Sequence, residues 1–224
     1  NFIGSPYPFP LSIDLDPVQF YGPLTYGLSG ESWSPEVTEL DPWNGYVVYN
    51  RTSSSQIVTL DPTATSAGRA ARSLDQEEGW LISLMASAGE YKDPINTFGA
   101  LESADNSLDW HDNPEITSPG KNLSLFFEME DDPVPLQYTS DIRQRDSGLK
   151  VWDVFLSNTT GTEVSLSWSH DQPIPPAIVV QLVDINTRRV IDLKTADILE
   201  LGRIDSRFYR QLKIVSGDET EVAA

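Results

Sequence analysis

Apolar and polar side chains alternate along much of this 224-residue chain, and that period of two restricts its fold more than any other feature. In residues 163–169, Val164, Leu166 and Trp168 fall on one face and serines fall on the other. Such alternation is typical of β-strands with one buried face and differs from the helical period. Beyond residue 68, the pattern predicts strands at 80–86, 123–129, 150–156, 163–169, 178–182, 190–193 and 208–215.

Two of these strand pairs are expected to form hairpins. The turn-forming sequence Asn158-Thr-Thr-Gly161 lies between 150–156 and 163–169, so we predict that 150–169 folds as one hairpin. The sequence Asp184-Ile-Asn-Thr187 separates the next two strands in the same way and predicts a second hairpin.

The N-terminal third has a different composition. Prolines and aromatic residues separate short strands that we expect at 24–26, 45–49 and 56–60. Residues 61–68 lose all periodicity and are interpreted as a linker, and a short helix is predicted at 70–77. Many short strands with turns between them indicate packed antiparallel sheets. We therefore predict an all-β protein, with a small N-terminal β module at 1–67 and an antiparallel β-sandwich, jelly-roll-like or Ig-like, at 68–224.

The composition restricts the partners of this chain. Its 34 acidic residues outnumber its 15 basic residues, which gives a formal net charge of -19. Such a surface repels phosphate backbones and anionic lipids, so we expect no nucleic-acid partner. The chain has no cysteine, which excludes disulfides and thiolate metal sites. It also has no apolar run long enough for a membrane-spanning helix, so we expect no membrane insertion.

Several short motifs resemble one group of exported proteins. Residues 1–10 (NFIGSPYPFP) and 39–49 (ELDPWNGYVVY) resemble a small β module in large secreted proteins of Bacteroidetes-like bacteria. The region that follows that module is resembled by residues 79–88 (GWLISLMASA) and, after them, by Asp93, Asn96, Gly99, Ala104, Asp109, Asp112 and Pro114. Residues 164–168 (VSLSW) and 212–217 (LKIVSG) resemble strands placed just before a C-terminal sorting domain. The resemblance implies an accessory segment of a multidomain protein handled by type IX secretion, secreted or at the cell surface, and it implies no catalytic residues.

Residues 101–115, LESADNSLDWHDNPE, are rich in side-chain oxygen atoms. An EF-hand loop is excluded, because Asp105, Asp109 and Asp112 stand four and three apart with no glycine among them. Three uses remain: turns in which the side chains bind their own backbone, contact with a substrate, or an irregular calcium site. The candidate calcium ligands are Asp109, Asp112, Asn113 and Glu115.

Other arrangements of catalytic residue types are weak. Both histidines, His111 and His170, precede an aspartate, and we expect both to be exposed loop residues. Serines are abundant, but no G-x-S-x-G motif supports a Ser-His-Asp triad. Glu128 and Glu130 share one face of a strand at a spacing near that of glycosidase acids, but we expect that face to be solvated.

The six tryptophans divide into two groups. Trp80, Trp152 and Trp168 are in phase with aliphatic neighbours and are predicted to lie in the core. The other three lie in loop-like contexts and are candidates for contact with a sugar or a protein, or for packing beneath a loop: Trp33, Trp43 and Trp110.

These observations favour a non-catalytic accessory segment of a secreted or cell-surface bacterial protein, stabilised by calcium, with the neighbouring domains of that protein as partners. Three alternatives stay open. The first is a carbohydrate-binding module of an exported hydrolase, with a glycan as partner. The second is a self-assembling surface or filament subunit, and the third is an acid hydrolase with paired carboxylates.

Overall fold

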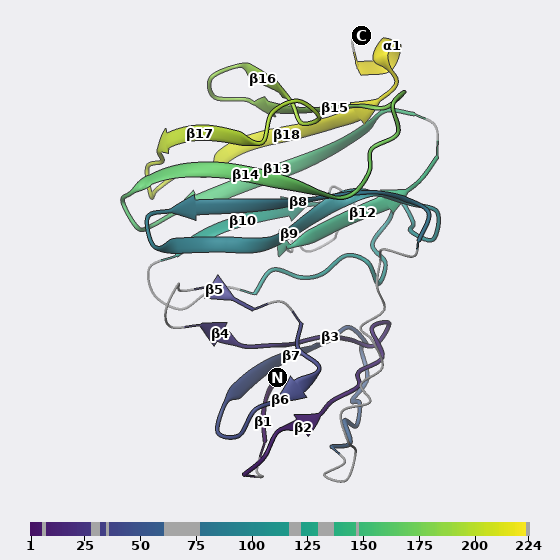
Figure 1. The fold of residues 1–224 in the computed structure, drawn as a ribbon, viewed down its shortest axis with the longest axis vertical. Helices are drawn as coiled ribbons and strands as arrows, with labels where there is room; N and C mark the ends of the chain where they lie inside the picture. Colours follow the sequence, from purple (N-terminus) through teal and green to yellow (C-terminus); the bar gives the residue numbers. More distant parts are fainter. Residues whose placement is uncertain are drawn as a thin grey trace. The chain divides into compact units, whose positions relative to one another are not determined.

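The computed structural model describes residues 1–5, 8–27, 32–34, 36–60, 77–116, 122–129, 137–146 and 148–222. Nearly all ordered elements are β-strands (Figure 1), and the all-β prediction is confirmed. The only helix among these residues is α1 (Glu219–Val222), and none of them forms a helix that is long and apolar enough to span a membrane.

The chain divides into two compact units, one formed by 1–29 with 33–74 and the other by 30–32 with 75–224. The boundary predicted near residue 68 and the linker predicted at 61–68 lie outside the described residues. Of the helix predicted at 70–77, only Glu77 is described, and it forms a bend.

In the described part of the smaller unit, the strands form one three-stranded antiparallel sheet and two strand pairs. Leu11, Ile13, Leu40 and Tyr46 form its hydrophobic core. Its three-stranded sheet has the order β1 (Phe2–Gly4), β7 (Gly45–Asn50) and β3 (Phe20–Leu24). Two further pairs are β2 (Leu11–Ser12) with β6 (Glu39–Leu40), and β4 (Tyr26–Gly27) with β5 (Ser32–Trp33).

The strand predicted at 56–60 is wrong. Val58 and Leu60 pack against the core of the smaller unit, whereas Ile57 is 92% exposed. The alternation is therefore real, but these residues have no strand assignment because packing one face does not provide a hydrogen-bonding partner.

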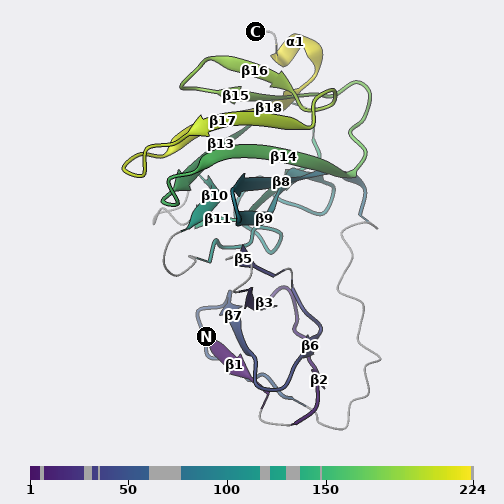
Figure 2. The same ribbon diagram turned by 60° about the vertical axis from the view of Figure 1, so that its left-hand side comes forward.

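The larger unit is a sandwich of two sheets (Figures 1 and 2). One sheet has the order β11 (Gln137–Tyr138), β10 (Leu123–Glu128), β13 (Lys150–Asn158), β18 (Arg210–Gly217), β15 (Val179–Asp184) and β16 (Arg189–Asp192). The other has the order β12 (Ser140–Gln144), β9 (Tyr91–Leu101), β8 (Gly79–Ala88), β14 (Glu163–Gln172) and β17 (Ile198–Arg203). All neighbouring strands are antiparallel except β12 and β9, so the predicted antiparallel sandwich is confirmed with one parallel pair.

The inward faces of the two sheets form one hydrophobic core. Trp80, Phe98 and Trp152 meet edge to face in it, with ring centroids 5.3–6.0 Å apart, a geometry that aromatic rings prefer. Trp168 is also buried, and its indole N–H donates to the backbone oxygen of Ala196 at 2.7 Å. The prediction that Trp80, Trp152 and Trp168 lie in the core is confirmed.

The hairpin predicted at 150–169 is wrong, because β13 and β14 belong to opposite sheets. Between them the buried Asn158 side chain accepts from the Thr160 backbone N–H at 3.0 Å and donates to the Thr162 backbone oxygen at 2.9 Å. These bonds stabilise the turn through which the chain passes from one sheet to the other. The second predicted hairpin is confirmed, since β15 pairs with β16.

Candidate functional site

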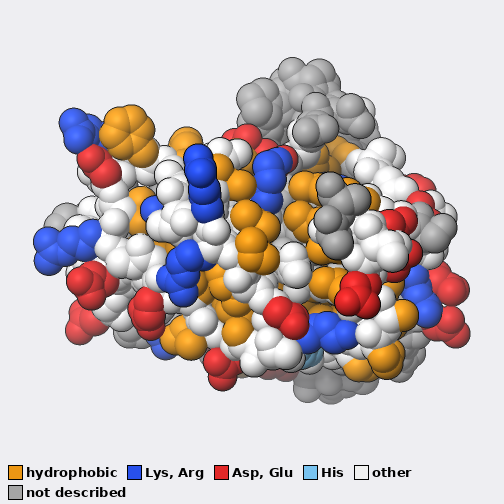
Figure 3. Space-filling view, turned by 90° about the horizontal axis from the view of Figure 1, so that it is seen from above, with side chains coloured by type: hydrophobic (Ala, Val, Ile, Leu, Met, Phe, Trp, Pro, Cys, Tyr) orange, Lys and Arg blue, Asp and Glu red, His pale blue; other side chains and the backbone are white. Residues whose placement is uncertain are grey.

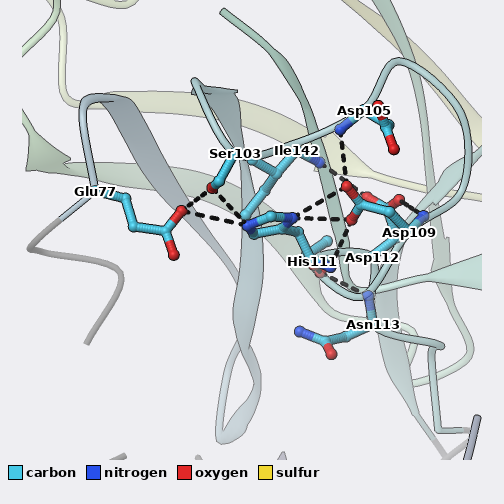
Figure 4. Close-up of polar contacts among 9 residues, drawn as sticks. Glu77, Ser103, Asp105, Asp109, His111, Asp112, Asn113 and Ile142 are labelled. Atoms are coloured by element: carbon cyan, nitrogen blue, oxygen red, sulfur yellow. Dashed lines mark hydrogen bonds and ion pairs between the residues drawn. The ribbon is translucent and has the colours of Figure 1, made fainter. Parts of the chain in front are cut away.

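The oxygen-rich stretch forms an excursion, residues 102–116, after β9 and ahead of β10. Figure 4 shows that the Asp109 and Asp112 carboxylates point at backbone N–H groups. The Asp109 carboxylate accepts hydrogen bonds from the backbone N–H groups of His111 at 2.6 Å and Asp105 at 2.8 Å. The Asp112 carboxylate accepts from the backbone N–H of Asp109 at 2.8 Å. These are the backbone-binding turns that the sequence left open beside calcium and substrate contact.

Asp112 also fastens the excursion to the five-stranded sheet. Its side chain accepts from the backbone N–H of Ile142, in β12, at 3.0 Å, and the residue is only 3% exposed. Burial raises the pKa of Asp112 to about 8, and the charges of Asp141 and Asp109 act in the same direction against the two backbone hydrogen bonds. Asp112, which connects the excursion to β12, is therefore expected to be protonated near neutral pH.

His111 is not the exposed loop histidine that the sequence predicted, because its side chain has no exposed area. Its Nδ1 lies 2.9 Å from the Asp109 carboxylate, and its Nε2 lies 3.4 Å from Glu77 and 3.2 Å from Ser103 Oγ. The Trp110 ring lies against it with centroids 3.7 Å apart. The ring is thus enclosed on several sides. His170 is exposed, as predicted, but it lies in the strand Glu163–Gln172 (β14) and not in a loop.

Ser103, His111 and Asp109 follow the order of a serine-hydrolase triad, but the proton positions differ from that chemistry. The Ser103 hydroxyl donates to the Glu77 carboxylate, so its hydrogen points away from the imidazole that would have to accept it. Burial acts to raise the pKa of Asp109, but hydrogen bonds from the His111 ring and from backbone N–H groups hold it below its ordinary value. The contacts therefore form a charged structural network.

The other two predicted calcium ligands lie further along the excursion. The backbone N–H of Asn113 donates to Ser140 Oγ at 2.7 Å, and the Glu115 carboxylate accepts from Ser124 Oγ at 3.0 Å. Burial raises the pKa of Glu115 well above its ordinary value, and the nearby charge of Asp93 adds to this effect. The sequence analysis named Asp93 only as part of a resemblance and did not predict that it lies near Glu115.

Within the described part of the chain, no three or more acidic or histidine side chains are arranged to hold a metal ion. Calcium at Asp109, Asp112, Asn113 and Glu115 stays a prediction. The hydrogen bonds of Asp109 and Asp112 show what these carboxylates do in this structure: they hold backbone N–H groups.

The three candidate tryptophans have different surroundings. Trp43 is 82% exposed and occupies a turn with a left-handed backbone, φ +65°. Trp110 is half-buried against His111, which corresponds to packing beneath a loop. Trp33 lies in β5, and its side chain is outside the described residues. Only Trp43 thus presents an open indole among the two described side chains.

The structure describes only one of the two acids of the glycosidase hypothesis. Glu128 is half-buried on β10, and Glu130 lies outside the described residues. A separate surface depression of about 350 Å³ is lined by His170, Pro173, Ile174 and Lys194. The Lys194 ammonium group there donates to two backbone oxygens, at 3.1 and 3.0 Å, so it too holds the chain.

The end of the larger unit that carries β15, β16 and α1 exposes apolar side chains among basic and acidic ones (Figure 3). Val190 of β16 and Ile198 of β17 are both more than half exposed, and these two strands end their sheets. The Arg189 guanidinium reaches from β16 to the Glu200 backbone oxygen of β17 at 3.4 Å. A charged side chain across two strand edges is a common protection against edge-to-edge pairing.

No family model, no curated protein and no solved structure matches this chain. The resemblance to type IX-exported modules therefore stays a prediction from the short motifs.

Proposed function

We propose that this chain is a non-catalytic accessory segment of a secreted or cell-surface bacterial protein, which supports and orients the domains beside it. The observation that carries this proposal is the use of Asp109, His111 and Asp112. These are the residue types from which an enzyme would build a site, and here they bind the backbone of an excursion or one another. Such networks, when fully hydrogen-bonded, make a scaffold rigid.

The charge of the chain supports an exported location. A formal charge of -19 keeps a protein soluble and discourages contact with anionic cell-surface polymers. The short motifs shared with exported proteins point the same way.

Cell fractionation tests the proposal. An antiserum against the purified chain should detect its antigen in the medium or on intact cells, where added protease removes it, and within a polypeptide larger than 224 residues. An antigen found only inside the cell, at the size of this chain alone, contradicts the proposal.

A carbohydrate-binding role is the second candidate, and it rests on Trp43. A bulky residue in a left-handed turn is strained, and strained residues are concentrated at functional sites. The exposed indole suits stacking against a sugar ring. A glycan array should then give signals that Trp43→Ala removes and that the control Phe208→Ala, at an exposed aromatic of the larger unit, retains. An array without signals contradicts this role.

A further inference from the structure

Two carboxylates from different segments converge at the start of β10. The Asp93 carboxylate, from β9, accepts from the backbone N–H of Leu125 at 2.6 Å. The Glu115 carboxylate, from the excursion, accepts from the side chain of the preceding residue, Ser124, at 3.0 Å. Because Ser124 and Leu125 are consecutive, the two acids meet at one point of the strand. Asp93 is buried and Glu115 is half-buried there, so their mutual repulsion is poorly screened by water.

Asn96, three residues after Asp93 on β9, supplies an independent sign of a missing partner. It is completely buried on the core side of β9, in phase with Phe98 and Ala100, and its Nδ2 lies 3.5 Å from the backbone oxygen of Asp93. Among the described residues, none donates a hydrogen bond to Asn96 Oδ1. A buried oxygen without a donor destabilises the folded state, so such groups are normally satisfied by water or an ion.

We propose that Asp93, Asn96 and Glu115 bind a calcium ion beside β10. The donors are carboxylate and amide oxygens, which calcium prefers, whereas zinc favours histidine and cysteine and magnesium demands a stricter geometry. Calcium also accepts backbone oxygens and water in an irregular shell of 6–8 ligands, which suits a site with two acids. Of the ligands expected from the sequence, only Glu115 belongs to this site.

The ion would connect three segments that are distant in the sequence: β9, the excursion and, through Ser124 and Leu125, β10. It would neutralise the two facing carboxylates and give Asn96 Oδ1 a positive partner. A ligand that binds only the folded state raises stability. The ion is therefore expected to stabilise the contact between the two sheets, whatever the function of the chain.

Calcium titration of the chelator-stripped chain tests the site. Calorimetry should give one bound ion, and 1 mM calcium chloride should raise the melting temperature, while the same concentration of sodium chloride should not. Glu115→Gln should weaken calcium affinity at least tenfold. Glu128→Gln, which removes a charge from the same strand β10, should leave the affinity unchanged. Absence of both heat and a melting shift overturns the proposal, as does binding that Glu115→Gln leaves intact.

Asn96→Leu is a second variant that keeps the test decisive if Glu115→Gln does not fold. Leucine has nearly the same volume and removes the buried oxygen, so the folded variant in chelator should melt no lower than the parent chain. It should also lose the calcium-induced rise. A variant that keeps the full rise shows that Asn96 is not a ligand and overturns the proposed site.

Discussion

The Asp112 side chain connects two segments of the larger unit by hydrogen bonds. It joins the excursion to β12 through the Ile142 backbone N–H, and it also closes the turn at Asp109. Because burial dominates its environment, its pKa lies near 8 instead of near the ordinary value of 3.8. The proton on this group therefore contributes to the stability of the sandwich.

The shifted pKa of Asp112 predicts the direction of a pH effect. An acid whose pKa is raised by folding contributes stability that is complete below its unfolded pKa and is lost as pH rises toward its folded pKa. Between pH 4 and pH 8, the parent chain should therefore lose stability relative to Asp112→Asn, by at most about 1.4 kcal/mol per pH unit. Urea unfolding of both proteins across this range measures the difference. A difference that does not change with pH contradicts the assignment.

Trp43 predicts a second effect at the scale of one residue. Left-handed backbone costs a bulky residue about 1–2 kcal/mol, and asparagine tolerates it better. Because the indole is 82% exposed, its removal costs little packing. Trp43→Asn should therefore raise the free energy of unfolding by up to about 1 kcal/mol. Denaturant unfolding checks this value. A clear loss of stability would mean that the indole packs on the protein in solution.

The surroundings of single residues were harder to predict than their type. The turns of Asp109 and Asp112 follow from local chemistry, so the sequence could suggest them. The burial of His111 depends on Glu77, which is 34 residues earlier in the chain, and no local pattern contains that contact. The proximity of Asp93 to Glu115 was not predicted for the same reason. Asn96, in phase with Phe98 and Ala100, could have indicated a polar residue on a core face.

At the scale of elements, alternation predicted which faces are buried but not which strands pair. Val154 on β13 and Leu166 on β14 both point into the core, as expected. That pattern is the same whether two strands lie side by side in one sheet or face each other across the core. The turn after Asn158, which that side chain stabilises by two hydrogen bonds to the backbone, carries the chain to the opposite sheet, and the alternation does not encode this direction.

Asn158 should therefore be important for stability. Asn158→Ala removes three hydrogen bonds from a fully buried side chain: one from the Thr160 hydroxyl and two with backbone groups. The expected loss is about 2–3 kcal/mol, since each hydrogen bond contributes about 1 kcal/mol. Asn122→Ala, at an exposed contact with Thr159, is the matched control and should cost less than about 0.5 kcal/mol. Equal losses in the two variants would show that the crossing turn does not depend on Asn158.

At the scale of the whole molecule, the described residues contain two clusters of buried apolar side chains, one in each compact unit. The cluster of the larger unit includes Trp80, Trp152 and Trp168, whereas the cluster of the smaller unit contains no tryptophan among its described residues. Each unit therefore has its own hydrophobic driving force, and a unit with its own core is expected to fold by itself.

A polypeptide of residues 75–224 should therefore fold alone. Its near-ultraviolet circular dichroism should retain the signal of the packed Trp80 and Trp152 rings, since both lie in its own core. It should unfold cooperatively. Its melting temperature should lie within a few degrees of the one that the same near-ultraviolet signal gives for the intact chain. Leu40→Ala in the intact chain, which opens a cavity in the other core, should leave this transition in place. A polypeptide that lacks the near-ultraviolet signal, or a tryptophan transition that moves with Leu40→Ala, would show that the sandwich depends on the smaller unit for its packing.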